Sequence, residues 1–544
     1  MTSLLILQCI LILMLTVVCR SLWKFVATSP LDNIPGPKRQ SLWAGNLKQL
    51  FDPHGWEFHR TLTQTFGRIS MLHGMFGDKL LYVYDPKAMH HILVKDQYVF
   101  EETRQFIATN KLVFGDGLLS TEGDHHKRQR KMLNPVFSIN HMRHMIPVFQ
   151  EITGMLRDTI ADQVKDGPKE INMLEWFTRT ALELVGQSGL GYSFDSLKVN
   201  TPSNAYSFAV KNFVPALQKT MMVRQYLPML SKLGPASFRK WVVKTLPWKA
   251  LRELDDIVEI MDKTSTEVFE SKKAALERGE ETVMQQIGQG KDIMSILLRA
   301  NMTASEGDRL PDSELMGQMS TLVFAAMDTT SGALARTFLT LAEHPEAQEK
   351  LRQELIQARA EKGVLDHDDL VGLPYLDAVC RETLRLYPPV TGVLRAPRQD
   401  IVLPFGNPIK GVDGKELHEV LVPKNTNIMV SILGSNRNPE IWGEDALEWK
   451  PERWLSPLPK TVTEAGIPGV YSHLMTFIGG GRSCIGFKFS QLEMKVVLAT
   501  LIETFSFKPS KEIVWSMGLS APRVKDSGSA RLQLPLLVEA IKAT

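Results

Sequence analysis

The sequence predicts a mainly α-helical fold with smaller β-sheets (α+β), built as one large domain. Helical periodicity covers most of residues 140–299 and 314–343, and a further helical pattern follows at 489–502. Short runs of β-forming residues occur at 68–75 and 80–84. No linker, repeat or low-complexity tract divides the 544 residues after the N-terminal segment. One catalytic or binding domain is therefore expected.

Composition places the chain among ordinary globular proteins, with 44% hydrophobic and 23% charged residues. The net charge of +3 and the lack of an extended Lys/Arg block argue against nucleic-acid binding. Of the four cysteines, Cys9 and Cys19 lie in the apolar N-terminal segment, and the others are Cys380 and Cys484. These are too few for a disulfide scaffold, so we expect the main domain to occupy a reducing compartment.

The N-terminus carries an apolar stretch, Leu4–Cys19, followed by Arg20 and Lys24. It lacks a small-residue cleavage site, so residues 1–23 are expected to form a retained transmembrane anchor rather than a cleaved signal or a core helix. Positive charge on its C-terminal side predicts a cytosolic main domain. Residues 24–40 form a proline-rich hinge, because proline fixes φ and cannot continue a helix.

Further elements are expected in chain order. A helix at 56–66 precedes the two strands, which a Gly-Asp turn joins, and Pro86 opens a helix at 88–94. Residues 100–119 look loop-rich. The long helix at 314–343 follows a Pro-Asp-Ser start signal and stops before Pro345. A strand edge is expected at 390–394.

Cys484 lies in the segment 476–487, among four glycines and beside Arg482, just before a helix. The helix N-terminus and the arginine both favour thiolate and lower the thiol pKa, and thiolate is the form that ligates metals. No second cysteine provides a disulfide or a zinc site here. The alternative is a structural cysteine in a glycine-rich turn.

Asp328, Thr329, Thr330 and Ser331 interrupt the apolar helix at 314–343. A charge and hydroxyls inside such a helix are unfavourable unless they are used. Hydroxyls that bond back to the i−4 carbonyl bend or open a helix, which makes room for a ligand or water. The alternative is a purely structural set of back-bonded hydroxyls.

Two further patterns support a site. Glu382 and Arg385 are i,i+3 neighbours on one helix face, and Arg453 follows in a Pro-Glu-Arg element. In the basic stretch 123–131, His126 and Arg130 share a helix face at i,i+4. The neighbouring cations at 127, 128 and 131 form either a solvated face or a docking surface for an acidic partner.

These motifs resemble those of the cytochrome P450 family, the haem-thiolate monooxygenases. The spacing Phe477-x-x-Gly480-x-Arg482-x-Cys484-x-Gly486 is similar to the family's haem-binding signature in all five fixed positions. The proline hinge, basic helix, acid–threonine helix and Glu-x-x-Arg motif occur in the family's order. The resemblance implies the cytochrome P450 fold, with residues 41–544 as the haem domain.

The resemblance also implies roles for individual residues. Haem b would be the cofactor, with Cys484 as the axial iron ligand. The other cofactor-binding residues would be Arg482, Phe477, Gly480 and Gly486 of the loop and His126, Arg130 and Arg395 near the propionates. Asp328 and Thr329 would deliver protons to iron-bound dioxygen. Glu382, Arg385 and Arg453 would form a structural network.

Two positions depart from the family pattern. His126 stands where tryptophan is usual, although an imidazole N–H also donates a hydrogen bond. Ala326 replaces the usual glycine beside the acid, adding a methyl group near the oxygen pocket.

The function implied is insertion of one oxygen atom from O2 into a lipophilic small molecule. Electrons would come from NADPH through a membrane-bound NADPH-cytochrome reductase, with the chain held in the endoplasmic reticulum membrane by a single span. The motifs look fungal, which favours a terpenoid or other secondary metabolite as substrate. Alternatives are a xenobiotic or fatty-acid hydroxylase, a haem-thiolate isomerase or dehydratase without O2 activation, a haem sensor or carrier, and an anchored binding protein without haem.

Overall fold

The computed structural model describes residues 23–199, 201, 204–279, 282–283, 287–518, 521–528 and 531–541. The expected anchor, residues 1–23, lies outside the described residues except for Trp23. No helix in the described ranges is both long enough and apolar enough to cross a membrane.

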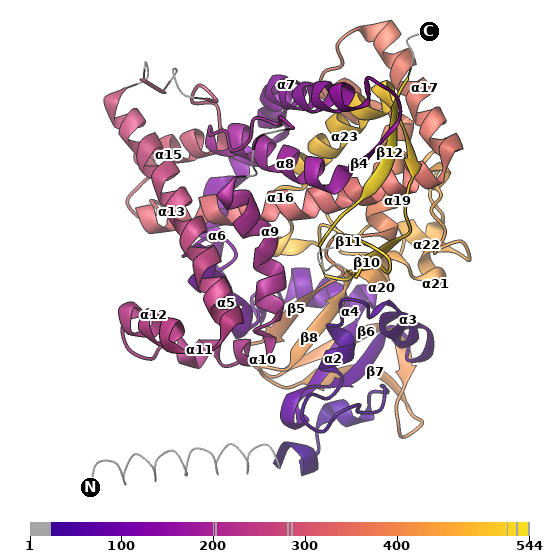
Figure 1. Ribbon diagram of the computed structural model, residues 1–544. Helices are drawn as coiled ribbons and strands as arrows, with labels where there is room; N and C mark the ends of the chain where they lie inside the picture. The colour runs from indigo at the N-terminus through magenta and orange to yellow at the C-terminus, as the bar shows by residue number, and fades with distance from the viewer. Residues whose placement is uncertain are drawn as a thin grey trace.

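Helices dominate the structure, as the sequence predicts (Figure 1). The α-helices are α2 (Leu47–Leu50), α3 (Trp56–Thr65), α4 (Pro86–His90), α5 (Arg104–Phe114), α6 (Gly123–Leu133), α7 (Ile139–Val164), α8 (Met173–Leu184), α9 (Ala205–Gln218), α10 (Met221–Arg224), α11 (Leu227–Leu230), α12 (Ala236–Thr245), α13 (Lys249–Arg278), α15 (Ile293–Thr303), α16 (Asp312–Glu343), α17 (Pro345–Lys362), α18 (His367–Gly372), α19 (Pro374–Leu386), α20 (Ile432–Asn436), α21 (Pro439–Trp442), α22 (Lys460–Thr463) and α23 (Phe487–Thr504). Short 3-10 helices are η1 (Pro30–Asn33), η2 (Met75–Gly77), η4 (Asn134–Phe137), η6 (Pro451–Trp454) and η7 (Gly480–Arg482), and π-helical turns are η3 (His91–Lys95) and η5 (Val185–Leu190).

The strands form small sheets beside the helices. They are β1 (Ile69–His73), β2 (Lys79–Val83), β3 (Phe100–Glu101), β4 (Lys169–Asn172), β5 (Gly392–Pro397), β6 (Ile401–Lys410), β7 (Glu416–Val422), β8 (Asn427–Ser431), β9 (Phe505–Pro509), β10 (Ile513–Ser516), β11 (Ala521–Val524) and β12 (Pro535–Ala540). The largest sheet has the order β1-β2-β8-β5-β3, and only its β2–β8 pair is parallel. The smaller sheets are β4-β12-β9, β6-β7 and β10-β11.

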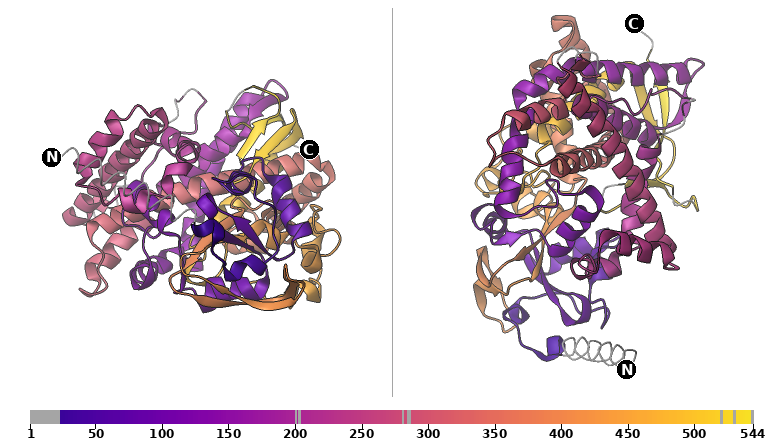
Figure 2. Two further views of the ribbon diagram at one scale, coloured as in Figure 1. Left: turned by 90° about the horizontal axis from the view of Figure 1, so that it is seen from below. Right: turned by 90° about the vertical axis from the view of Figure 1, so that its left-hand side faces the viewer.

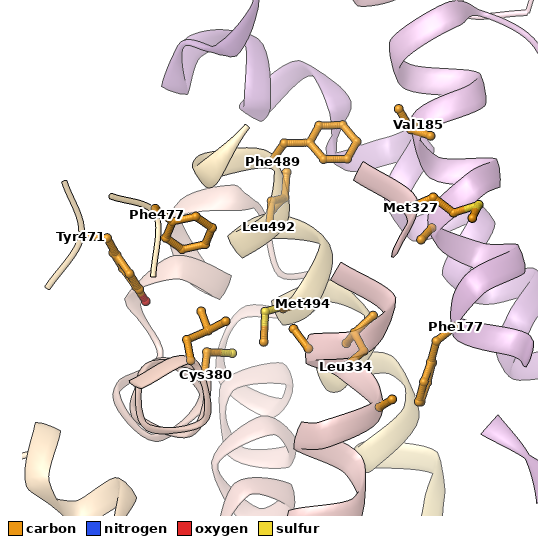
Figure 3. Packing of buried hydrophobic residues seen from close by; sticks show 14 of the residues in the cluster. Phe177, Val185, Met327, Leu334, Cys380, Tyr471, Phe477, Phe489, Leu492 and Met494 are labelled. Atoms are coloured by element: carbon orange, nitrogen blue, oxygen red, sulfur yellow. The ribbon is translucent and has the colours of Figure 1, made fainter. Parts of the chain in front are cut away.

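Helix α16 runs through the middle of the molecule, between α7, α8 and α23 on one side and the five-stranded sheet on the other (Figure 1). The left view in Figure 2 shows the helices α12, α13 and α15 gathered at one side of the molecule. Buried side chains from α8, α16, α19 and α23 meet in one cluster (Figure 3). Labelled members of this cluster are Phe177, Met327, Leu334, Cys380, Phe489, Leu492 and Met494. The central helix and the helix after the cysteine loop are thus fixed in a common core.

Several local predictions are confirmed and others are wrong. The helix at 56–66, the strands β1 and β2, and the stop of α16 before Pro345 agree with the sequence. Residues 100–119 are not mainly a loop, because α5 occupies much of this segment. Thr103 caps α5 by accepting a hydrogen bond from the N–H of Phe106, and Gly115 ends it with a φ of 78°. Thr103 and Gly115 are therefore the local sequence signals that mark the two ends of this helix.

Two boundaries also differ. The expected helix at 88–94 is split into α4 and the π-helical turn η3, and the strand edge predicted at 390–394 is shifted to β5 at Gly392–Pro397. The hydroxyls of α16 do not open the helix, which runs without interruption from Asp312 to Glu343.

Candidate active site

Backbone hydrogen bonds and a close contact with η3 hold the cysteine loop in place. The N–H of Cys484 donates to the carbonyl of Phe477 at 3.0 Å, and the N–H of Ser483 donates to that of Gly480 at 3.1 Å. Gly480 has a φ of 73°, and a Cβ there would lie 1.7 Å from the carbonyl oxygen of Leu93. Only glycine fits that position. The loop is therefore shaped by its contact with η3 as well as by its own sequence.

Cys484 and Ala325 of α16 both keep accessible surface. Protein atoms nevertheless desolvate the Cys484 thiol, so it borders an internal space rather than the outer surface. Gly486 needs no positive φ, and a Cβ on it would meet no other atom within 4 Å. A flat group bound against this loop would find room there, which fits the predicted role of the two positions.

The expected lowering of the Cys484 pKa is wrong for the protein alone. Burial raises the pKa of this thiol, and a hydrogen bond from the Gly486 backbone and the charge of Arg130 only partly oppose that effect. Arg482 does not act on the thiol, because its guanidinium points to Glu101 at 3.0 Å and to the carbonyl of Thr121 at 2.7 Å. A metal ion at the sulfur would supply the charge needed to hold thiolate.

Arg130 of α6 binds the cysteine loop directly. Its Nη1 donates to the carbonyl of Ser483 at 2.5 Å and its Nη2 to the Ser483 hydroxyl at 3.0 Å. His126, one turn earlier, is buried, and its imidazole forms no hydrogen bond with any described residue. Burial, with the charges of Arg482 and Arg130, lowers the pKa of His126 to about 3. The imidazole is therefore neutral at pH 7 and has one N–H to donate.

Arg395 of β5 completes this group of donors. It is 2% exposed, and its Nη1 donates to Glu102 at 2.9 Å and to the carbonyl of Leu394 at 2.8 Å. Its Nη2 is buried without a hydrogen-bond partner. Arg395 also lowers the pKa of His126, which places it in the same cluster as Arg130 and Arg482. Unused buried donors of this kind suit an anion such as a haem propionate.

On the opposite side, α16 presents Asp328 and Thr329. Burial raises the pKa of Asp328 to about 6, and the cation of Lys211 on α9 opposes the shift. The Thr329 hydroxyl donates to the carbonyl of Ala325 at 2.8 Å, and Ser331 donates to the carbonyl of Asp328 at 3.3 Å. The back-bonding named as the structural alternative is therefore present. The hydroxyl of Thr329 keeps its lone pairs to accept another proton donor.

Glu382 lies at the centre of a buried polar network. It accepts from Nε and Nη2 of Arg385, both at 2.8 Å, and from the indole of Trp454 at 2.9 Å. Arg453 approaches the same carboxylate at 3.4 Å. Both Glu382 and Arg385 are fully buried. The structure thus brings together the three residues that the sequence grouped.

This network reaches the cysteine loop through α20. Arg385 donates to the carbonyl of Asn436 at 3.0 Å, and the Asn436 amide donates to the Thr476 hydroxyl at 2.9 Å. Asn436 also accepts from the N–H of Met475 at 2.8 Å. The chain entering the loop is therefore tied to Glu382 through Arg385 and Asn436.

Sequence reasoning missed three charged residues, of which Glu493 is fully buried and Lys211 and Arg224 are half-buried. Lys211 acts on Asp328, Arg224 lines a cavity, and Glu493 on α23 is fully buried with neither carboxylate oxygen hydrogen-bonded. Burial raises the pKa of Glu493 well above its ordinary value. Each is a charged residue in a helical segment with apolar neighbours, the same signal that drew attention to Asp328.

A central helix with an acid–threonine pair, a glycine-rich cysteine loop, and the unused donors of Arg395 and the neutral His126 define a haem-thiolate type of site. The family model for cytochrome P450 matches residues 35–520. Two cytochrome P450 monooxygenases of Postia placenta, numbers 91 and 81, are 52% and 54% identical, covering 98% and 95% of this chain and 99% and 94% of their own lengths. A protein named ganoderic acid synthetase, from Ganoderma lucidum, is 43% identical over 95% of each chain.

The chain belongs to the cytochrome P450 family. It is an oxidoreductase of the monooxygenase type. Members hold haem iron through a cysteine thiolate, bind lipophilic substrates and generally need a redox partner, and the residues around Cys484 fit such a group.

Proposed function

We propose that this monooxygenase binds haem b through Cys484 and inserts one oxygen atom from O2 into a lipophilic secondary metabolite, with a terpenoid as the leading class. The single observation that carries the cofactor assignment is the loop itself, where Cys484 borders an internal space opposite α16 and beside the unused donors of His126 and Arg395. When bound there, haem iron with an axial thiolate supplies the chemistry of O–O bond cleavage.

The protein residues would do the positioning and the proton transfer. Arg130 holds the loop through Ser483, and Arg395 and His126 would orient the propionates. Asp328 would hold and release a proton, because a pKa of about 6 lets it exchange protons near neutral pH. Thr329 would receive that proton and pass it onward. Phe477 packs against Phe487, with ring centroids 6.0 Å apart, and keeps the loop side apolar.

Support for the substrate class comes from a cavity and from a relative. A largely apolar cavity of about 630 Å³ lies beside the five-stranded sheet, a size suited to a lipophilic small molecule. The name of the Ganoderma relative refers to ganoderic acid. A fatty-acid or xenobiotic hydroxylase remains the second candidate, since the same apolar lining would accept such compounds.

We also propose a cytosolic catalytic domain on the endoplasmic reticulum membrane, with electrons from NADPH-cytochrome reductase. Besides the apolar stretch at 1–23, exposed apolar side chains gather on α11 and α12, where Met229, Phe238 and Trp241 stand beside Lys240 and Lys244. Aromatic and cationic side chains together suit a membrane interface. Flotation of full-length protein with anionic vesicles, and loss of the reductase-driven reaction in their absence, would support this placement. Free protein at the bottom of the gradient would contradict it.

The reaction is tested by supplying full-length holoenzyme with NADPH, reductase and 18O2, and screening terpenoids by mass spectrometry. A product heavier by one 18O atom is expected, and Asp328→Asn should reduce its rate by about tenfold or more without changing the melting temperature. A product without 18O would indicate the isomerase or dehydratase alternative. A fully active Asp328→Asn protein would remove Asp328 from the proton path.

A further inference from the structure

The cavity of about 630 Å³ has on its wall one half-buried charged group, Arg224, that forms no ion pair with any described residue. The cavity is bounded by the five-stranded sheet, α2, the start of α5 and the segment from α9 to α10. Its apolar lining includes Leu50, Phe51, Phe106, Val214, Leu217 and Leu394. Arg224, at the end of α10, forms part of the same wall.

Among the described residues, the guanidinium of Arg224 has no hydrogen-bond or ion-pair partner. Its Nε is buried without a hydrogen bond, and the structure gives the side chain no ion pair among the described residues. An uncompensated buried charge is strongly unfavourable, so such groups in proteins are normally paired. Arg224 is half-buried, and its free N–H groups on the cavity wall are available as donors to a ligand that enters the cavity.

The other charged residues at this cavity are paired, hydrogen-bonded or, in the case of Lys48, exposed to solvent. Lys79 pairs with Asp32, Lys219 with Glu253 at 3.0 Å, and Asp78 with Lys24. The carboxylate of Asp52 accepts from the N–H of His54 at 2.8 Å. No carboxylate of the described residues compensates Arg224, since burial alone acts on its pKa and lowers it.

We propose that this cavity binds the carboxylate end of an otherwise apolar ligand, with Arg224 as the anchor. The apolar skeleton would lie along the lining residues while the carboxylate accepts the guanidinium N–H groups, for which the planar fork of arginine is well suited. The inference rests on the proposed function in one respect, since it takes the ligand to be the substrate of that reaction. It narrows the substrate class to lipophilic acids.

The test compares an acid with its own ester on full-length holoenzyme. Abietic acid with methyl abietate, and oleic acid with methyl oleate, are titrated by quenching of intrinsic tryptophan fluorescence. A hydrogen bond to a charged group predicts that at least one acid binds wild type roughly ten- to hundredfold more tightly than its ester. Arg224→Gln should abolish that difference and leave ester binding unchanged. Lys219→Gln, on the same wall but already paired, should keep it.

Equal binding of acid and ester to wild type in both pairs would overturn the proposal, and so would a full acid preference in Arg224→Gln. The second readout is the melting temperature. Arg224→Met should melt above wild type, because it removes an unpaired, partly desolvated charge, and the acid that binds more tightly should raise the melting temperature of wild type but not of the variant. A lower melting temperature for Arg224→Met, or equal stabilisation of both proteins, would contradict the anchor.

The two proposals fail separately. An acid preference that depends on Arg224, without 18O in any product, would retain the anchor and reject the monooxygenase substrate assignment. Incorporation of 18O into acids and esters alike, unchanged in Arg224→Gln, would retain the reaction and reject the anchor.

Discussion

Replacing Glu382 by alanine removes the acceptor at the centre of the buried network. Glu382 accepts two bonds from Arg385, one from Trp454 and one from the N–H of Lys450 at 3.0 Å. Its loss leaves a fully buried guanidinium with only carbonyl partners. Breaking a buried pair in this way costs about 3–5 kcal/mol of unfolding free energy. For a chain of this length that corresponds to a melting temperature lower by about 3–5 °C.

The measurement is thermal unfolding followed by circular dichroism, together with the haem content of the purified protein. Because the network leads to the cysteine loop, we expect Glu382→Ala to lose haem as well as stability. Glu57→Ala is a matched control, since Glu57 and Arg60 form an i,i+3 pair at 2.8 Å on an exposed helix face. Exposed ion pairs of this kind add little to the free energy of unfolding, so the Glu57→Ala control should melt like wild type. A Glu382→Ala protein that keeps its haem and its melting temperature would refute the reasoning.

Three other changes have defined outcomes. Gly480→Ala should prevent haem incorporation, because its Cβ would overlap a backbone carbonyl. Gly363 has a similar φ of 77° but no atom within 4 Å of a Cβ, so Gly363→Ala should lower the free energy of unfolding by only about 1–2 kcal/mol and keep haem. Equal haem content in the two variants would contradict this. Arg395→Gln should speed the transfer of haem to apomyoglobin by about tenfold or more. Glu102→Gln removes the carboxylate partner but keeps the guanidinium, so it should not speed haem loss. Similar rates of haem loss in the two variants would remove Arg395 from cofactor binding. The raised pKa of Glu493 means that the native state binds its proton more tightly than the unfolded chain does, so wild-type stability should fall as pH rises from about 4.5. Glu493→Gln should flatten that dependence and gain most over wild type at pH 8, and parallel pH profiles in urea denaturation would disprove it.

Much of the fold and of the site could be predicted because the signals are local. The spacing around Cys484, the i,i+3 pair of Glu382 and Arg385, and the proline that ends α16 depend on neighbours in the chain. The boundaries of α5 and β5 were not predicted, because helix caps and strand register are set by only a few residues, whose signal competes with the composition of the whole segment.

What could not be predicted depends on burial by distant segments. The Cys484 pKa was expected to fall from its nearby charges, but desolvation by packed elements dominates, and the guanidinium of Arg482 is committed to β3 and the chain before α6. In the sequence, Arg224 and Glu493 stand out only as charged residues among apolar neighbours, since a missing partner is visible only when every neighbour is known.

The most direct test of the central claim is the reduced, carbon-monoxide difference spectrum of wild type and Cys484→Ser. Thiolate ligation by Cys484 predicts a Soret band far to the red in wild type that is absent from the variant. A well-folded, haem-loaded wild-type protein without that band, or a Cys484→Ser variant that retains it, would contradict the assignment of Cys484 as the iron ligand.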